Sequence, residues 1–363
     1  MEALRELVRR RFPGATVVSS DRLGDDAGHD GDAPSRDATA KGSGYGAPVR
    51  VVVREGDGTE RTLVFHTARA DDFGHDRRAD RAAEMILAFD TYRLVPRHVP
   101  ALDVGVITSS GELRSIADAA ETYLLTEWAP GQVYAQDLRR IAKDGATPRD
   151  LHRLDTLVRY LVELHATHRG RLAVYTRAVR DLIGSGEGVF GMIDGYADDV
   201  PSADPERLQR IEERCASWRW RLRGREPRLA RIHGDLHPFN IVFDGEADLA
   251  LLDASRGSMG EPADDLTALA INFVFFALDD PGAWSRGLGA LWHRLWSTYL
   301  DATSDRELLE VAAPWLAWRA LVIANPRWYP GLSADGRDRL LTWIEHALVA
   351  PRFDPVSANE VLA

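Results

Sequence analysis

One stretch of the sequence combines the side-chain types and the spacing needed for metal-assisted chemistry. It begins at Arg231 and reads R-I-H-G-D-L-H-P-F-N-I-V-F-D-G-E-A-D-L-A-L-L-D. It holds oxygen-bearing side chains at Asp235, Asn240 and Asp253. Such groups suit Mg²⁺, which keeps several waters and is usually shared with substrate phosphates. A carboxylate that the metal does not use is free to accept a proton from an incoming hydroxyl. The stretch therefore predicts a magnesium site next to a general base.

The apolar pattern supplies the elements that would position these residues. Two short apolar runs, residues 241–243 and 249–252, flank an Asp-Gly dipeptide that favours a tight turn, and this predicts a β-hairpin. In an antiparallel pair the start of the first strand lies beside the end of the second, so Asn240 and Asp253 are expected at the same end. Asp235 precedes the hairpin in a loop whose proline opposes an ordinary helix. Singly, such residues more often form turns, but three together favour a site.

The motif H-G-D-L-H-P-F-N, followed by L-L-D and then by G-E-P-A-D-D-L, resembles the catalytic signature of the aminoglycoside phosphotransferase and choline kinase family. This family comprises small-molecule kinases with a protein-kinase-like fold. The resemblance implies that Asp235 is the catalytic base and that Asn240 and Asp253 are the magnesium ligands. It also implies that His233 braces the loop, and that ATP and Mg²⁺ are the cofactors.

The D-D-L motif after the hairpin has two interpretations. By resemblance, Asp265 would be the structural aspartate of the family. On local grounds, Asp264 or Asp265 is also a candidate N-cap for a helix formed by the apolar residues that follow.

A competing interpretation of the catalytic stretch predicts a metal-dependent hydrolase. His233, Asp235 and His237 would be metal ligands in an H-x-D-x-H pattern, with Asp253 as a fourth. The glycine and the proline within the motif disfavour the regular strand that such alternation needs, and the asparagine would have no role.

The segment expected to bind nucleotide phosphates lies near the N-terminus. Residues 13–46 have the composition of a loop, and their end, K-G-S-G-Y-G, leads directly into an apolar strand expected at residues 48–53. A glycine-rich turn that feeds a strand lets backbone N–H groups come close to phosphates. The residues predicted to bind the phosphates are Lys41, Gly42, Gly44 and Gly46.

The next expected strand, at residues 62–66, departs from the family. In kinase-like folds this strand carries a lysine that holds the phosphates and pairs with a helix glutamate, whereas this sequence has His66. Glu84, on a helix predicted over residues 76–92, would be that glutamate. Either the chain is a catalytically silent nucleotide-binding protein, or Lys41 reaches the phosphates from the glycine-rich segment, as in the with-no-lysine protein kinases. We favour Lys41, because a neutral imidazole is a poor substitute for an ammonium.

The apolar spacing divides the chain into two parts. Strands at residues 102–107 and 123–126 would complete a small sheet, after which the spacing becomes helical. We predict an α+β, protein-kinase-like fold with an N-lobe of residues 1–129, containing a small mixed β-sheet, and a larger helical C-lobe of residues 130–363. By resemblance, the hinge that reads adenine would be Glu127, Trp128 and Ala129. Helices are expected over residues 149–168, 174–183, 206–222 and about 334–349.

Composition limits the kinds of binding partner and the cellular location to be expected for this protein. The net charge of −11 argues against nucleic acid as the main partner. Cys215 is the only cysteine, which excludes an intrachain disulfide and favours a reducing cytoplasm. The longest apolar run, residues 266–278, is interrupted and too short to span a bilayer, so no membrane partner is expected.

The expected activity is ATP-dependent phosphorylation of a hydroxyl on a small molecule, such as an aminoglycoside-like antibiotic or a related metabolite. A protein kinase is disfavoured because the stretch after Asp253 is short and lacks an A-P-E-like anchor. Candidate acidic residues for the wall of the acceptor pocket are Glu261, Asp279 and Asp280.

Overall fold

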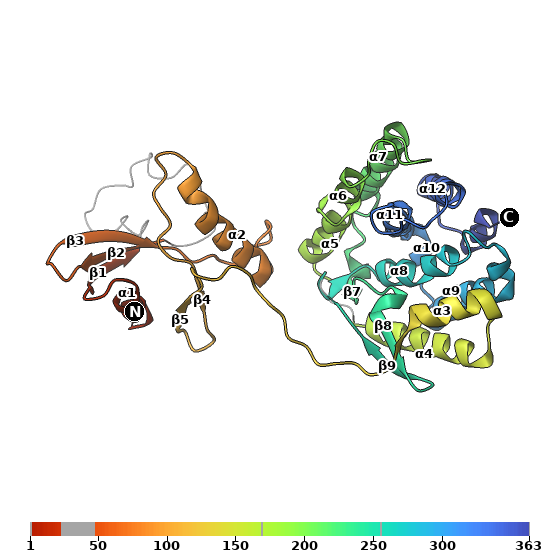
Figure 1. Ribbon diagram of the computed structural model, residues 1–363, viewed down its shortest axis with the longest axis horizontal. Helices are drawn as coiled ribbons and strands as arrows, with labels where there is room; N and C mark the ends of the chain where they lie inside the picture. The colour runs from red at the N-terminus through yellow and green to blue at the C-terminus, as the bar shows by residue number, and fades with distance from the viewer. Residues whose placement is uncertain (1, 23–47, 168–169, 255, 363) are drawn as a thin grey trace. The chain divides into compact units, whose positions relative to one another are not determined.

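The chain folds as two compact units, Met1–Thr126 and Glu127–Ala363 (Figure 1). The computed structural model describes residues 2–22, 48–167, 170–254 and 256–362. The glycine-rich segment with Lys41, Gly42, Gly44 and Gly46 lies outside the described residues, so its proposed contact with phosphates stays a prediction.

The first unit contains a three-stranded antiparallel sheet in the order β1-β2-β3, formed by β1 (Thr16–Arg22), β2 (Val49–Arg54) and β3 (Glu60–Phe65). Helix α1 (Glu2–Arg11) packs Leu4 and Val8 into one cluster with the buried valines of β2. The predicted strands at β2 and β3 are confirmed. The prediction of loop throughout residues 13–46 is wrong at β1. Apolar and polar residues alternate only weakly there, and the strand is held by its backbone pairing with β2.

The rest of this unit holds helix α2 (Arg78–Thr91), the 3-10 turn η1 (Tyr92–Leu94) and a separate two-stranded sheet of β4 (Gly105–Ile107) and β5 (Leu113–Ser115). The predicted helix over residues 76–92 is confirmed. The predicted strand at residues 123–126 is wrong, because this segment has no regular structure and Tyr123 is 94% exposed. A short apolar run forms a strand only where a neighbouring backbone pairs with it, and its own sequence does not specify that neighbour.

The second unit is mainly helical, with small sheets at one side (Figure 1). Its strands are β6 (Gln132–Val133), β7 (Ala230–Arg231), β8 (Ile241–Asp244), β9 (Asp248–Leu251) and β10 (Met259–Gly260). Its helices are α3 (Tyr134–Asp144), α4 (Pro148–His165), α5 (Leu172–Gly184), α6 (Val189–Asp194), α7 (Pro205–Arg221), α8 (Pro262–Phe275), α9 (Gly289–Thr303), α10 (Leu308–Val311), α11 (Ala313–Ala324), α12 (Ala334–Val349) and α13 (Ala358–Val361). Helices α4, α5, α7 and α12 confirm the four predicted by residue range, and α8 confirms the helix expected after the D-D-L motif. Helices α3 and α6 were not predicted.

Helix α8 lies in the core of the second unit and packs against α11. After the two aspartates of its first turn its sequence is mostly apolar on all sides, which is typical of a helix surrounded by others, and most of its residues are buried. The large buried side chains around it include Trp292, Trp296 and Trp315. No described helix is long and apolar enough to cross a membrane.

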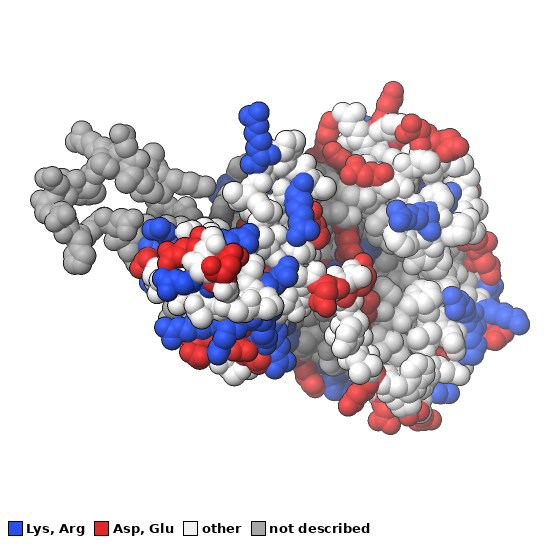
Figure 2. Space-filling model, turned by 60° about the vertical axis from the view of Figure 1, so that its left-hand side comes forward, with Lys and Arg blue, Asp and Glu red and all other residues white. Residues whose placement is uncertain are grey.

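On the face shown in Figure 2, acidic and basic side chains are interspersed among uncharged ones.

Candidate active site

The hairpin predicted from the sequence is confirmed as β8 and β9. The two strands pair antiparallel with Ile241 opposite Leu251, and Gly245 in the turn has a φ of 64°, as an Asp-Gly turn requires. Next to the last pair, the backbone N–H of Leu252 donates to the carbonyl oxygen of Asn240 at 2.9 Å. Asn240 and Asp253 therefore emerge at the same end of the hairpin.

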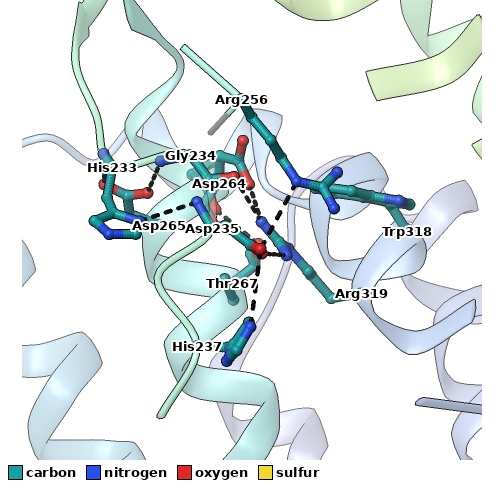
Figure 3. Close-up of polar contacts among 12 residues, drawn as sticks. His233, Gly234, Asp235, His237, Arg256, Asp264, Asp265, Thr267, Trp318 and Arg319 are labelled. Carbon is teal, nitrogen blue, oxygen red and sulfur yellow. Dashed lines mark hydrogen bonds and ion pairs between the residues drawn. The ribbon is translucent and has the colours of Figure 1, made fainter. Parts of the chain in front are cut away.

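The loop that carries Asp235 is held by a buried carboxylate on α8 (Figure 3). The Asp265 oxygens accept hydrogen bonds from the backbone N–H of His233 at 2.7 Å and of Gly234 at 2.8 Å. His165 Nε2 lies 3.2 Å from the same carboxylate, and its other ring nitrogen lies 2.8 Å from the hydroxyl of Tyr299. Asp265 thus has the structural role that the resemblance implies, and His165 is a packed histidine.

The local prediction of an N-cap at Asp264 or Asp265 is wrong. Helix α8 begins at Pro262 with Glu261 as its N-cap residue, and both aspartates lie in its first turn. Proline at the first helical position accounts for the earlier start, since its missing N–H would have no partner there in any case.

Two histidines brace the loop from within. His233 Nδ1 accepts the backbone N–H of Asp235 at 3.2 Å, and His237 Nδ1 accepts that of Phe239 at 3.2 Å. Each imidazole is therefore oriented by the backbone two residues further on. Within the described ranges, no three or more His, Cys, Asp or Glu side chains are grouped so that they could hold a metal.

Two arginines and a histidine surround the carboxylate of Asp235 (Figure 3). Its Oδ1 accepts a hydrogen bond from Arg319 Nη1, and its Oδ2 lies 3.8 Å from both Arg256 Nε and His237 Nε2. Burial acts to raise the pKa of Asp235, but the charges of Arg319 and Arg256 outweigh it, so that the pKa lies below its ordinary value. Asp235 is therefore ionised at neutral pH, as a proton acceptor must be.

Asn240 and Asp253 offer the donor atoms that Mg²⁺ prefers. The Asn240 side chain donates from Nδ2 to the backbone oxygen of Asp235 at 3.1 Å, which leaves its amide oxygen as the atom for a cation. The exposed Asp253 has a φ of 55°, and its carboxylate has no ion-pair partner in the described part of the chain. Two oxygen donors fit a Mg²⁺ ion that completes its shell with water and phosphate oxygens.

The remaining predicted nucleotide-site residues lie as follows. His66 is exposed directly after β3, and Glu84 lies on α2 with its carboxylate 3.3 Å from Nε2 of His75. Glu127, Trp128 and Ala129 lie in a segment without regular secondary structure, ahead of β6. Their contact with a nucleotide stays a prediction.

The acidic residues suggested for an acceptor-pocket wall have other partners. Glu261 is buried, pairs with Arg228 at 2.6 Å and accepts a hydrogen bond from the hydroxyl of Tyr175. Asp279 accepts a hydrogen bond from the backbone N–H of Ser333, the N-cap residue of α12, and Asp280 pairs with Arg286. Glu261 is therefore part of the core, where Arg228 pairs with its charge.

Sequence reasoning missed two arginines near Asp235 and the tryptophan that contacts them. The ring of Trp318 lies near both guanidinium groups, with the Cζ atom of Arg319 at 4.0 Å and that of Arg256 at 4.5 Å from its centroid. A signal for Arg319 exists, because it is the only charged residue in the apolar helix α11, A-P-W-L-A-W-R-A-L-V-I-A. A lone charge in such a helix is buried only with a partner.

With this geometry in place, comparison with known proteins identifies the family. The chain belongs to the phosphotransferase enzyme family APH, whose family model matches residues 40–302. The match confirms the resemblance seen in the sequence, together with the α+β, protein-kinase-like fold. It indicates phosphoryl transfer to a small molecule.

Several solved structures are similar. They include aminoglycoside phosphotransferase APH(3'')-Id from Streptomyces rimosus, with 17% identity over 77% of this chain and 93% of that chain and a TM-score of 0.34. A glucosamine kinase shows 15% identity over 99% and 100% of the two chains with a TM-score of 0.39, and choline kinase from Cryptosporidium parvum shows 10% over 99% and 93% with 0.33. Sequence comparison with curated proteins gives no match. The family assignment rests on the family model, since these identities and TM-scores are low.

Proposed function

We propose that this protein is a cytoplasmic kinase that transfers the γ-phosphoryl group of ATP to a hydroxyl of a small molecule. The observation that carries the proposal is the braced, ionised carboxylate of Asp235 beside Asn240, at the end of the hairpin from which Asp253 also emerges. The acceptor would be an aminoglycoside-like antibiotic or a related metabolite.

Asp235 would orient the acceptor hydroxyl and take its proton. The acceptor oxygen forms a bond to the γ-phosphorus, the bond from that phosphorus to the β,γ-bridging oxygen breaks, and ADP leaves with the bonding electron pair. The proton moves from the hydroxyl to Oδ2 of Asp235, because Oδ1 is engaged by Arg319. A fixed carboxylate in this position contributes through both orientation and proton transfer.

Asn240 and Asp253 would hold Mg²⁺. When bound, this ion would offset negative charge on the phosphates. The glycine-rich segment would place backbone N–H groups around the phosphates, and Lys41 would supply the ammonium that the sequence lacks at His66. Glu127, Trp128 and Ala129 would contact the adenine. The remaining residues proposed to line the nucleotide site are Gly42, Gly44, Gly46, His66 and Glu84.

One observation favours a second candidate function. By resemblance, the position that carries a lysine in kinase-like folds would be His66, and this residue is exposed directly after β3. A catalytically silent nucleotide-binding protein would tolerate this replacement, whereas an active kinase must obtain the cation elsewhere.

A screen of hydroxyl acceptors with ATP and Mg²⁺, scored by ADP release, tests both candidates. A kinase releases ADP only with certain acceptors, and mass spectrometry then finds the phosphorylated product. A silent protein binds nucleotide in calorimetry but releases no ADP with any acceptor.

A further inference from the structure

Arg319 is a buried cation that bridges the catalytic loop and α8 (Figure 3). From α11 it donates Nη1 to Oδ1 of Asp235 and Nη2 to both Oδ1 of Asp264, at 2.7 Å, and the backbone oxygen of Gly234, at 3.1 Å. Its side chain is only 8% exposed, and its planar group lies near the ring of Trp318. Three oxygens from two elements thus fix one guanidinium.

These contacts leave the two oxygens of the Asp235 carboxylate in different environments. Oδ1 is engaged by Arg319, while Arg256 Nε and His237 Nε2 each lie 3.8 Å from Oδ2, beyond hydrogen-bonding distance. The carboxylate plane is therefore set by the guanidinium, and Oδ2 is the oxygen left for an incoming hydroxyl.

Asp264 is the second carboxylate that holds the guanidinium of Arg319. It lies in the first turn of α8 beside Asp265, which itself holds the backbone of the catalytic loop. The guanidinium of Arg319 bonds to Asp264 on one side and to Asp235 on the other. The helix that fixes the catalytic loop, α8, therefore also fixes the position of Arg319. A flexible lysine could not span both carboxylates in a fixed plane.

We propose that Arg319 is a positioning residue for phosphoryl transfer: held by Asp264, it orients the Asp235 carboxylate so that Oδ2 faces the acceptor hydroxyl. The inference rests on the proposed function, and it adds a residue from α11 to the machinery of the catalytic loop. Arg256 is different, since it is 29% exposed and lies 3.8 Å from Asp235.

A double-mutant cycle distinguishes positioning from a purely structural role. Arg319→Gln is expected to lower kcat about 10- to 100-fold with the KM for ATP unchanged, the range for a misplaced catalytic group. Arg319→Lys, which keeps the charge and loses the fork, is expected to have an intermediate kcat. In an Asp235→Asn background, Arg319→Gln should lower kcat no further, because Arg319 acts through Asp235.

Arg337→Gln is the matched control. Arg337 is also buried, and it donates to the backbone oxygens of Ala324 and Leu332 away from Asp235. It is expected to lower stability while kcat per folded molecule stays unchanged. If Arg319→Gln does not fold, Arg319→Lys and Asp264→Asn replace it in the cycle, and both should lower kcat only where Asp235 is present.

The outcomes separate the two proposals. An active wild-type enzyme in which the Arg319 substitution costs the same factor with and without Asp235 overturns the positioning role and leaves the kinase proposal standing. A wild-type protein that releases no ADP with any acceptor overturns both.

Discussion

The carboxylate of Asp265 accepts the backbone N–H of Gly234 at 2.8 Å, across 31 positions of sequence. Through this contact the buried helix α8 holds the loop that presents Asp235. The loop has no long element of its own to define its shape, so its geometry depends on one side chain from elsewhere in the fold.

Replacement of Asp265 by alanine is therefore expected to destabilise the second unit strongly. It leaves two buried backbone N–H groups without an acceptor, at a cost of about 1–3 kcal/mol for each. Urea unfolding followed by tryptophan fluorescence measures the loss. The control, Asp335→Ala, removes a carboxylate that is 80% exposed and should change the free energy of unfolding by about 0.5 kcal/mol or less. Equal losses for the two variants would contradict this role of Asp265.

Gly131 is expected to tolerate no side chain. It has a φ of 113°, and a Cβ atom there would lie 2.3 Å from the carbonyl oxygen of Phe243 in β8. Gly131→Ala should therefore push β6 away from the hairpin and lower the free energy of unfolding by about 3 kcal/mol or more, since backbone strain alone costs about 1–3 kcal/mol. Gly58→Ala, at a φ of 90° with open space around it, carries only the strain. Thermal unfolding compares the two, and the reverse order of stability would show that the contact with β8 is unimportant.

The stability of the protein should depend on the ionisation of Asp264. Burial raises the pKa of this carboxyl from 3.8 to about 6, although Arg319 opposes the shift. The folded protein thus binds the proton more tightly than the unfolded chain, so the contribution to stability is complete at low pH and is lost as the pH rises from about 4 to about 6. Asp264→Asn does not titrate and should lack this loss.

Urea unfolding at several pH values checks this prediction. The free energy of unfolding of the wild type, minus that of Asp264→Asn, should fall with rising pH across that window. A difference that stays constant, or that grows with pH, would contradict a raised pKa at Asp264.

Lys41→Ala should abolish most turnover with the fold intact, because Lys41 is proposed to supply the phosphate-binding ammonium that is missing at His66. The sequence offers a matched control, since its only other lysine is Lys143, exposed near the end of α3. Lys143→Ala should have wild-type activity. Steady-state kinetics with ATP and the identified acceptor compares the two variants, and near wild-type activity for Lys41→Ala would discard its role.

The parts of the site that sequence reasoning predicted are local. The Asp-Gly turn and the two apolar runs specify the hairpin, and they bring Asn240 and Asp253 to one end by strand geometry alone. The long amphipathic helices such as α4 and α7 were also predicted from local sequence, because their apolar residues recur with the period of a helix.

The parts that were missed depend on distant partners. Arg319 contacts Asp235 across 84 positions, and nothing in the spacing around either residue specifies that pairing. Strand β1 likewise exists because β2 pairs with it, and the apolar run at residues 123–126 is not a strand although its composition resembles one. Propensity and pattern do not determine which backbone becomes a neighbour.

The central claim is that Asp235 is the general base of phosphoryl transfer to a small-molecule hydroxyl. ADP release by the wild type and by Asp235→Asn, with ATP, Mg²⁺ and the best acceptor from the screen, tests it most directly. We predict that the variant remains folded and loses about 10²-fold or more in kcat, the range for a positioned general base. An Asp235→Asn variant with wild-type kcat would contradict the account.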